Sequence, residues 1–522
     1  MKKFIAALLL ASIFVMSLQF VQTSDADEGV YITIDDINYL IYDGTATVTG
    51  VEDLPSGNVV VPETIEYDGK TVDVCKIDSG AFIMPGIVSV TLPSTITEIS
   101  DFAFRSSTLE RIEVDSDNAE YCSDDGVLYD HEMTMVIKYP PEKTDEIYAA
   151  PATLVNIGSE CFEGNAYLTE VWLPDSLKAI DYRAFASCIS LSKMNHDGEN
   201  NNLPKGTLVV NSGAFAYCEN LTNLSFNESL MVIGPSTFMC AGLEQVYIPY
   251  SVSTIGESAF YSCPIKTIES DNIAYVVIDN VLYESRNNSK SLVTYPAGSE
   301  REYFEIPKGV SYIYSNAFSG CLHLKTIKLN EDLNVVTSWA FYECTSLETV
   351  KIPDSVIILE ALSFYGCVNL KNIEFGNKVS ILGAYCFSGT GIEEMYIPES
   401  VTSIGTGAFA SCKKLKSLEI PDIVVVVDQY ILYECYAMEQ ITMWGPNAVM
   451  DEHTLDIGTF DKTVTVSLTV HKDLEIPNHV NNEFTILNIS IIGDRPYPYE
   501  NLIGAAVCIA ILVGIILVVR EV

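Results

Sequence analysis

The chain has little basic charge and few histidines or tryptophans. Its 522 residues include 29 lysines and arginines against 70 aspartates and glutamates, which gives a net charge of −41, and only 6 histidines and 3 tryptophans. Such an acidic chain repels a phosphate backbone, and this excludes a general nucleic-acid binder. The same acidity keeps a long molecule dispersed in water.

Patterns that carry catalysis or hold metals are also missing. The histidines are scattered outside any metalloprotease or nucleophile–base motif, and no Cys-x-x-Cys pair exists. The acidic segment 115–125 lacks the ligand spacing of a calcium-binding EF-hand loop. We therefore expect no enzyme, no cofactor and no metal. An enzymatic alternative would need its chemistry in residues 445–494.

One local pattern fills most of the chain instead. Its marker is a phenylalanine that recurs mostly every 22 or 23 residues, with Leu432 as the last member. The phenylalanines are Phe82, Phe104, Phe162, Phe185, Phe215, Phe238, Phe260, Phe318, Phe341, Phe364, Phe387 and Phe409. A period of this length predicts a solenoid, in which neighbouring coils stack because no single coil buries its own apolar face.

Each repeat begins with the pattern of a short strand. Val350 and Ile352 alternate with polar residues, which is the period of two of a half-buried strand, and Pro353 ends it. Phe364 and Cys367, three residues apart, are predicted to share one face of a single helical turn.

These units resemble a known family. The segments Leu347-Glu-Thr-Val-Lys-Ile-Pro353 and Val401-Thr-Ser-Ile-Gly-Thr-Gly-Ala-Phe409 are similar to the BspA-type leucine-rich repeat of bacterial, archaeal and protist surface proteins. The resemblance covers about residues 59–444. It implies a β-rich leucine-rich-repeat solenoid, in a family whose members serve as adhesins, receptors and proteins of unknown role. Because an open terminal coil would expose its core and its strand edge, we also expect β caps at both ends.

Two spacings of 58 residues interrupt the period. The extra residues repeat each other, and their turns offer residues that tolerate positive φ. The matching segments are Ser116-Asp-Asn118 with Ser270-Asp-Asn272, Val127-Leu-Tyr129 with Val281-Leu-Tyr283, and Asp125-Gly126 with Asp279-Asn280. We predict a duplicated hairpin that elaborates a coil. A binding protrusion is the alternative.

The two ends of the chain indicate its cellular location. Lys2 and Lys3 precede an apolar run, as in a secretory signal peptide, and the uncharged segment 502–519 has the length of a membrane helix. The predicted order is a signal peptide at 1–26, an N-terminal β cap with the first coil at 28–75, the solenoid at 76–444 with hairpin inserts at 115–150 and 270–305, a C-terminal β cap at 445–494, a stalk at 495–501 and a transmembrane helix at 502–519.

Eight of the fourteen cysteines occupy one position, three residues after the phenylalanine position. They are Cys188, Cys218, Cys263, Cys321, Cys344, Cys367, Cys412 and Cys435. Stacked coils bring such positions within the Cα range of a disulfide, but parallel inward side chains disfavour the required torsion. We interpret them as a column of free, buried thiols.

The outward residues of the strands form the candidate binding face. The candidates on it are Trp172, Tyr247, Tyr396, Lys328 and Lys351. Exposed aromatics are enriched at recognition surfaces, and two adjacent lysines are unusual on an acidic protein. β-propensity alone is the other explanation for the aromatics.

We therefore predict a single-pass membrane protein whose repeats lie outside the cell and bind a protein or glycan. The alternative is a structural spacer or lattice protein of the cell envelope without a specific ligand.

Overall fold

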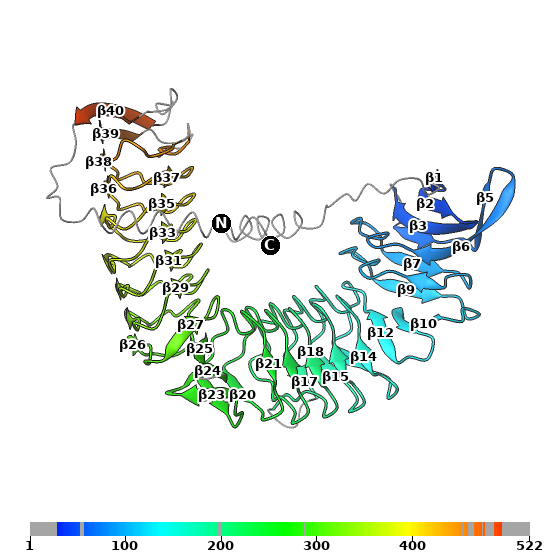
Figure 1. The fold of residues 1–522 in the computed structure, drawn as a ribbon. Helices are drawn as coiled ribbons and strands as arrows, with labels where there is room; N and C mark the ends of the chain where they lie inside the picture. Colours follow the sequence, from blue (N-terminus) through cyan, green and yellow to red (C-terminus); the bar gives the residue numbers. More distant parts are fainter. Residues whose placement is uncertain are drawn as a thin grey trace. The chain divides into compact units, whose positions relative to one another are not determined.

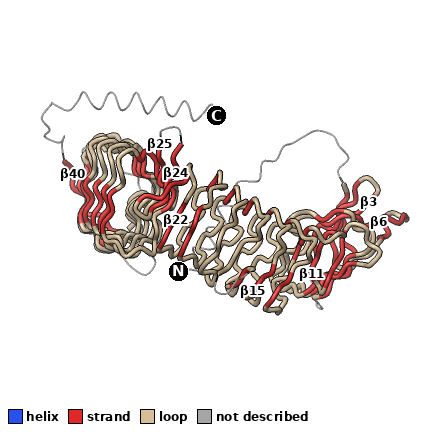
Figure 2. Tube along the Cα trace, turned by 90° about the horizontal axis from the view of Figure 1, so that it is seen from below, coloured by secondary structure: helices blue, strands red, loops and turns tan. Residues whose placement is uncertain are grey.

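The computed structural model describes residues 29–52, 57–195, 200–286, 289–450, 453–457, 464–471, 473–474 and 485–492. Every regular element within them is a β-strand, joined by turns and loops (Figure 2). The predicted signal peptide, stalk and transmembrane helix lie outside the described residues. Within the described part, no helix is long and apolar enough to cross a bilayer.

The chain divides into two compact units. The smaller contains the chain up to Ser106 together with Val114–Glu120. Its main sheet has the order β1-β2-β3-β6-β5, with β8 also paired to β6. Alternating residues of β2, such as Ile37 and Tyr39, are buried in its core. The strands up to the division are β1 (Val30–Ile34), β2 (Ile37–Tyr42), β3 (Thr45–Val51), β4 (Asn58–Val60), β5 (Thr64–Tyr67), β6 (Lys70–Ile77), β7 (Ser89–Leu92), β8 (Glu98–Ile99) and β9 (Arg111–Val114).

The larger unit is a stack of coils, and most coils contribute a strand to a row of short parallel sheets that we call the strand face (Figure 1). The last two strands extend this row into the segment predicted as a C-terminal cap. The strands are β13 (Ile147–Ala149), β15 (Glu170–Trp172), β17 (Lys193–Met194), β20 (Gln245–Ile248), β22 (Thr267–Ser270), β26 (Tyr303–Glu305), β28 (Thr326–Lys328), β30 (Thr349–Lys351), β32 (Asn372–Glu374), β34 (Glu394–Tyr396), β36 (Ser417–Ile420), β38 (Gln440–Met443), β39 (Val464–His471) and β40 (Thr485–Ile492).

A second parallel sheet is built from strands of two residues, one per coil. The apolar member of each pair, such as Ile157 or Leu359, is buried between the two sheets. These strands are β14 (Asn156–Ile157), β16 (Ala179–Ile180), β18 (Val209–Val210), β19 (Val232–Ile233), β21 (Thr254–Ile255), β29 (Val335–Val336), β31 (Ile358–Leu359), β33 (Ile381–Leu382), β35 (Ser403–Ile404) and β37 (Val426–Val427).

The segment around each phenylalanine closes the coil, and the prediction of a helical turn there is wrong. The N–H of Cys344 donates to the carbonyl of Phe341 (3.3 Å), but the N–H of Phe341 donates to Ser363 in the next coil (2.8 Å). Trp339 and Glu343 flank the ring with left-handed φ values of 63° and 53°. Two tight turns therefore replace the helical turn, so that backbone bonds also join coils on this side.

The phenylalanine rings stack from coil to coil, as the period predicts. Phe341 lies 4.9 Å from Phe318 and 5.0 Å from Phe364, centroid to centroid, in stacked geometry. Such ring pairs contribute about 0.5–1.5 kcal/mol beyond the area that they bury. With the two parallel sheets, this column confirms a β-rich solenoid of roughly 23-residue repeats.

The cysteine column lies beside the rings. The described cysteines are free, and the thiol of Cys344 donates to the carbonyl of Phe318 in the preceding coil (3.0 Å). Cys367 and Cys435 make the equivalent bonds to Phe341 and Phe409. The thiols are thus hydrogen-bond donors as well as apolar fillers.

The two inserts elaborate a coil, because each supplies a tyrosine at the phenylalanine position. Tyr139 stacks on Phe162 (4.9 Å) and Tyr295 on Phe318 (5.1 Å). The N–H of Tyr295 donates to Ala317 of the next coil, as a phenylalanine does in a regular coil. The strands of the inserts and the one that follows the second are β10 (Tyr121–Asp124), β11 (Val127–Asp130), β12 (Met135–Lys138), β23 (Tyr275–Ile278), β24 (Val281–Arg286), β25 (Ser289–Thr294) and β27 (Val310–Ile313).

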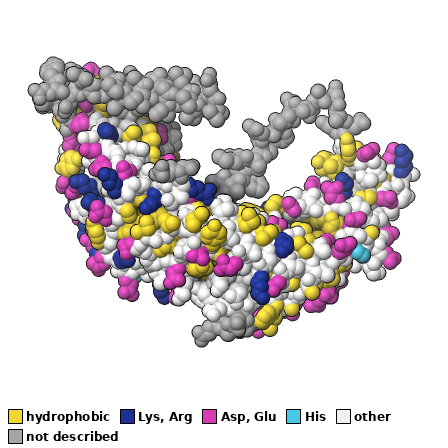
Figure 3. Space-filling model, turned by 60° about the horizontal axis from the view of Figure 1, so that its bottom comes forward, with side chains coloured by type: hydrophobic (Ala, Val, Ile, Leu, Met, Phe, Trp, Pro, Cys, Tyr) yellow, Lys and Arg dark blue, Asp and Glu magenta, His cyan; other side chains and the backbone are white. Residues whose placement is uncertain are grey.

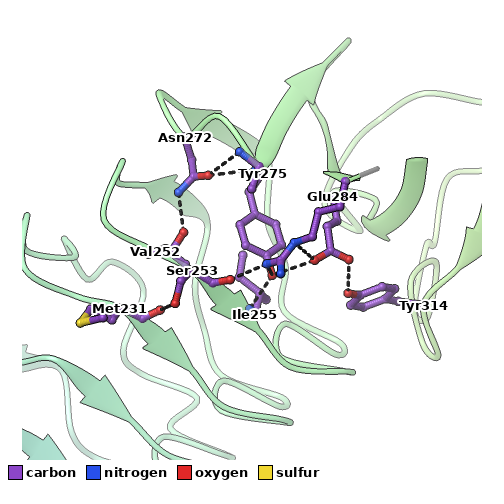
Figure 4. A network of polar contacts seen from close by, with 10 residues as sticks. Met231, Val252, Ser253, Ile255, Asn272, Tyr275, Glu284 and Tyr314 are labelled. Carbon is purple, nitrogen blue, oxygen red and sulfur yellow. Dashed lines mark hydrogen bonds and ion pairs between the residues drawn. The ribbon is translucent and has the colours of Figure 1, made fainter. Parts of the chain in front are cut away.

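Both sheets break at the second insert. The second sheet ends at β21 and resumes with β23-β24-β25-β27, while the strand face ends at β22 and resumes at β26. Side chains replace the missing backbone partners (Figure 4): the N–H of Ile255 donates to the Tyr275 hydroxyl (2.8 Å), and Arg286 donates to the carbonyl of Ser253. The hairpin therefore acts as an internal cap on the coils that precede it.

Candidate functional site

The strand face exposes all five predicted residues. In β15, β20 and β34 the buried residue alternates with an exposed one, so that Trp172, Tyr247 and Tyr396 project away from the core. Lys328 and Lys351 occupy the equivalent outward positions of β28 and β30. The period of two thus predicts the side of the sheet on which each side chain lies.

Only the two lysines are neighbours. Lys328 and Lys351 are register partners in adjacent parallel strands. The three aromatics belong to separate sheets, since β15 lies in β13-β15-β17, β20 pairs with β22, and β34 begins the sheet that continues to β40. The five residues therefore do not form one compact pocket.

Each lysine is paired with a carboxylate of a neighbouring coil. The Nζ of Lys328 lies 2.7 Å from Glu305, and that of Lys351 lies 3.4 Å from Glu374. The hydrogen bond with Glu305 raises the pKa of Lys328. The row across four coils reads Glu, Lys, Lys, Glu. These lysines consequently help to join coils, and they form a weaker anion site than the sequence indicates.

Inter-coil ion pairs recur elsewhere on the same surface. Lys325 lies 2.6 Å from Glu302, and Lys416 lies 2.9 Å from Glu393, in each case one coil away. Exposed pairs of this kind contribute about 0–1 kcal/mol each. Most of the basic charge on this face is therefore used within the solenoid.

Each aromatic side chain lies beside a carboxylate. The indole N–H of Trp172 donates to Glu170, and the Tyr396 hydroxyl donates to Glu394 (3.4 Å). A hydrogen bond to Asp271 raises the pKa of Tyr247. A flat apolar ring next to an acceptor suits a ligand with an apolar surface and hydrogen-bond donors, in a protein or a sugar.

The strand face also exposes two apolar residues that the sequence analysis does not predict. Tyr303 begins β26 and its hydroxyl donates to Glu305 (3.2 Å), and Ile147 begins β13, next to the strand of Trp172. Both strands follow an insert, where the repeat spacing of 22 or 23 residues is interrupted. The signal that finds the first is Phe304-Glu-Ile-Pro307, which matches the strand pattern of a regular repeat.

The acidic patterns do not form a metal site in the described residues. No group of three or more histidine, cysteine, aspartate or glutamate side chains is arranged there to hold an ion. Asp125 of the first hairpin turn instead pairs with Lys143 (2.7 Å), and Asp279 of the second pairs with Arg301 (2.8 Å). Both turns are thus fastened by a basic residue.

Stacked coils with a parallel strand face and a cysteine-lined phenylalanine column define a leucine-rich-repeat solenoid. The family model for the BspA type leucine-rich repeat region matches six copies, at residues 69–126, 155–289, 297–416 and 380–470. The chain belongs to this family, which confirms the resemblance. No catalytic family is indicated.

Three of the similar solved structures are of bacterial proteins. One is a leucine rich cell surface protein from Faecalibacterium prausnitzii, with 28% identity, coverage of 80% of this chain and 95% of that chain, and a TM-score of 0.48. Another is a leucine-rich repeat protein from Bacteroides ovatus, with 20% identity, coverage of 88% and 99%, and a TM-score of 0.35. The pneumococcal vaccine antigen PcpA has 19% identity, coverage of 90% and 100%, and a TM-score of 0.39. A comparison with curated proteins finds no match.

Proposed function

We propose that this protein is a membrane-anchored extracellular recognition protein that binds a macromolecule through the strand face. The observation that supports this most directly is the projection of Trp172, Tyr247 and Tyr396 into solvent, each beside an acceptor carboxylate. Large aromatics with a polar partner are typical of binding hot spots. The ligand class is an extracellular protein or glycan.

Truncation of the aromatics tests this proposal. Purified protein is applied to an array of glycans and extracellular matrix proteins, and Trp172→Ala, Tyr247→Ala and Tyr396→Ala are compared with the parent chain. An anchor residue should weaken a saturable interaction by about 30-fold. The circular dichroism spectrum should stay unchanged, because the side chains lie outside the core.

Lys328→Ala serves as the matched control. Its ammonium is already paired with Glu305, so we expect a smaller loss of affinity than for the aromatics. If all three aromatic variants bind as the parent does, the binding site does not lie on these residues.

Membrane anchoring is a separate part of the proposal. It depends on the apolar segment 502–519 and on the signal-like segment 1–26, both of which are sequence patterns. Protease added to intact cells should release the repeats and leave a short membrane-bound fragment. Repeats that resist the protease on intact cells but not on lysed cells would contradict this topology.

A structural role in the cell envelope is the second candidate. The regular stacking of coils and the many inter-coil ion pairs give an elongated element that suits a spacer. Regular arrays on isolated membranes, formed without ligand and unaffected by Trp172→Ala, would favour this role.

A further inference from the structure

The turn that ends each strand contains one position that faces solvent. It directly follows the proline, asparagine or glycine after the strand, and a bond such as that from Val356 N–H to the Pro353 carbonyl (3.1 Å) closes the turn. The residues at this position are Ser94, Ala119, Ala152, Asp175, Lys205, Glu228, Tyr250, Ile273, Lys308, Glu331, Asp354, Asn377, Glu399 and Asp422. Two consecutive members, Tyr250 and Ile273, are large and apolar, whereas all the others are small, polar or charged.

Neither residue is explained by packing or by backbone preference. Tyr250 is 63% exposed and Ile273 is 75% exposed. Strand propensity accounts for an exposed aromatic inside a strand, but these residues lie in turns, where small and polar residues are favoured. The first insert and the coil before it provide an internal comparison, because they have Ala119 and Ser94 at the matching positions.

The two side chains belong to one surface. The amide of Asn272 donates to the carbonyls of Pro249 (2.9 Å) and Tyr250 (3.1 Å), which holds the next residue, Ile273, against the turn of Tyr250. The carboxylate of Asp271, in the same neighbouring coil, lies close to the hydroxyl of Tyr247, three residues before Tyr250. Tyr247, Tyr250 and Ile273 therefore lie on one surface of two adjacent coils, and we call them the tyrosine–isoleucine patch.

Carboxylates surround this patch. Glu269 is the register partner of Tyr247 across β20 and β22, and the charges of Asp271, Glu228 and Glu269 all act to raise the pKa of the Tyr247 hydroxyl. Figure 3 shows exposed hydrophobic side chains in groups among aspartates and glutamates on the face that it brings forward. The patch is thus apolar at its centre and negative at its rim.

We propose that the tyrosine–isoleucine patch docks a basic protein segment that presents arginine next to aliphatic side chains. The tyrosine rings accept the face of a guanidinium group, the rim carboxylates pair with its charge, and Ile273 contacts the aliphatic neighbours. This inference rests on the proposed function and assigns a partner class to one part of its surface.

The chemistry of the patch disfavours other occupants. A second copy of the chain has a net charge of −41 and is repelled by the acidic rim. A glycan stacks on tyrosine, but the branched aliphatic side chain of Ile273 offers it neither a flat surface nor a hydrogen bond. A basic, partly apolar polypeptide satisfies all parts of the patch.

The test uses the purified full chain and a fluorescein-labelled peptide in which arginine and leucine alternate. Binding is measured by fluorescence anisotropy at physiological salt. The double variant Tyr250→Ser with Ile273→Ala installs the residues found at the matching positions of the first insert and the coil before it. It should weaken binding at least about tenfold with an unchanged melting temperature. The control Glu331→Ser with Asp422→Ala removes two carboxylates at the same turn position of other coils, and it should bind as the parent does.

Two further peptides separate charge from apolar contact. Replacement of arginine by glutamate should abolish binding, and replacement of leucine by serine should weaken it about tenfold. Equal affinity of the parent and the Tyr250/Ile273 variant would overturn the proposal, as would equal losses in that variant and in the control. A glycan whose binding is lost in the variant, with no peptide binding, would assign the patch to glycans and also overturn it.

The outcome is distinct from that of the proposed function. If the peptide does not bind but an array ligand is lost with Trp172→Ala or Tyr396→Ala, strand-face recognition stands and the patch assignment fails. If binding of the peptide depends on the patch, while Trp172→Ala and Tyr396→Ala do not change binding to the array, the patch proposal stands and the wider strand-face proposal fails.

Discussion

The regular coils after the second insert and the junction at that insert join neighbouring coils by different groups. In the regular run from β26 to β38, backbone bonds link coils within the two strand-face sheets β26-β28-β30-β32 and β34-β36-β38, in the second sheet and around each phenylalanine. At the junction, the hydroxyl of Tyr275 (Figure 4) and the side chains of Arg286 and Glu257 supply bonds between coils. A backbone ladder tolerates sequence change, whereas the junction depends on a few specific side chains.

The junction is also asymmetric across the coil. On the phenylalanine side, residues of adjoining coils touch directly, because Glu257 accepts from the N–H of Ser315 (2.8 Å) and Asn316 donates to Ser258 (2.7 Å). On the strand side, the turn of the hairpin covers β22, where the side chain of Asn280 accepts from the N–H of Ile268 (2.7 Å). The hairpin thus covers the preceding coil at β22 and β21, whereas the phenylalanine side is bridged directly.

The largest expected effect is the loss of a ring from the regular column. Phe341 is fully buried between Phe318 and Phe364, so Phe341→Ala should cost about 3–5 kcal/mol of unfolding free energy. Phe260→Ala at the junction should cost less, because Phe260 is slightly exposed and stacks on Phe238 alone among the described rings. Urea unfolding followed by circular dichroism measures both. Equal costs would show that the junction packs as a regular coil does.

A smaller effect should follow from Tyr275→Phe. The change leaves the buried N–H of Ile255 without its acceptor, at a cost of about 1–3 kcal/mol. Tyr283→Phe in the same hairpin is the control, since the Tyr283 hydroxyl is buried without a hydrogen-bond partner and its removal should be neutral or stabilising. Amide hydrogen exchange at Ile255 should accelerate in the first variant and stay unchanged in the second. Unchanged exchange in both would remove the capping role of Tyr275.

The sequence predicts the solenoid well because the period of two and the phenylalanine spacing report burial directly, as at Val350, Ile352 and Phe341. The prediction of a helical turn around each phenylalanine is wrong for a physical reason. A spacing of three suits a helical turn and a pair of tight turns alike. The left-handed position after the ring is a glycine in some coils, such as Gly366 and Gly389, but non-glycines such as Glu343 occupy it in others and carry no turn signal.

At the candidate site, the sequence likewise predicts which side chains are exposed but not which of them pair with each other. Alternation predicts that Trp172 and Lys328 face solvent. It does not predict that Lys328 is paired with Glu305, because alternation gives the side of the sheet on which a side chain lies and not which outward side chains pair.

Substitutions in the cysteine column distinguish the contribution of hydrogen bonding to stability from that of apolar packing. A serine at position 344 retains the donor to the Phe318 carbonyl, so Cys344→Ser should cost about 1 kcal/mol, towards the low end of the range for burying a polar group. Cys344→Ala loses the bond and leaves a small cavity, and should cost more. Alkylation after denaturation without reductant should label Cys321, Cys344 and Cys367 in the parent protein. Pairs linked by a disulfide in mass spectra would contradict the free column.

The smallest expected effect concerns pH at the junction. Burial raises the pKa of Glu257 above its ordinary value of 4.5, and the nearby carboxylates of Glu284 and Glu360 add to this, while the bonds from Ser315 and Tyr312 oppose it. A carboxyl group whose pKa is higher in the folded protein than in the unfolded chain binds more protons in the folded state. Its contribution to stability is therefore present below the ordinary value and is lost as pH rises through the raised pKa.

The variant Glu257→Gln keeps an acceptor for the Ser315 N–H and has no charge to bury. Relative to the parent, it should gain unfolding free energy as pH rises from about 4 to 7, because the parent then carries a buried carboxylate. Urea unfolding of both proteins across this range measures the difference. Glu331→Gln, an exposed change in the regular run, should leave the pH profile unaltered. Parallel profiles for the parent and Glu257→Gln would show that the junction does not respond to pH through this residue.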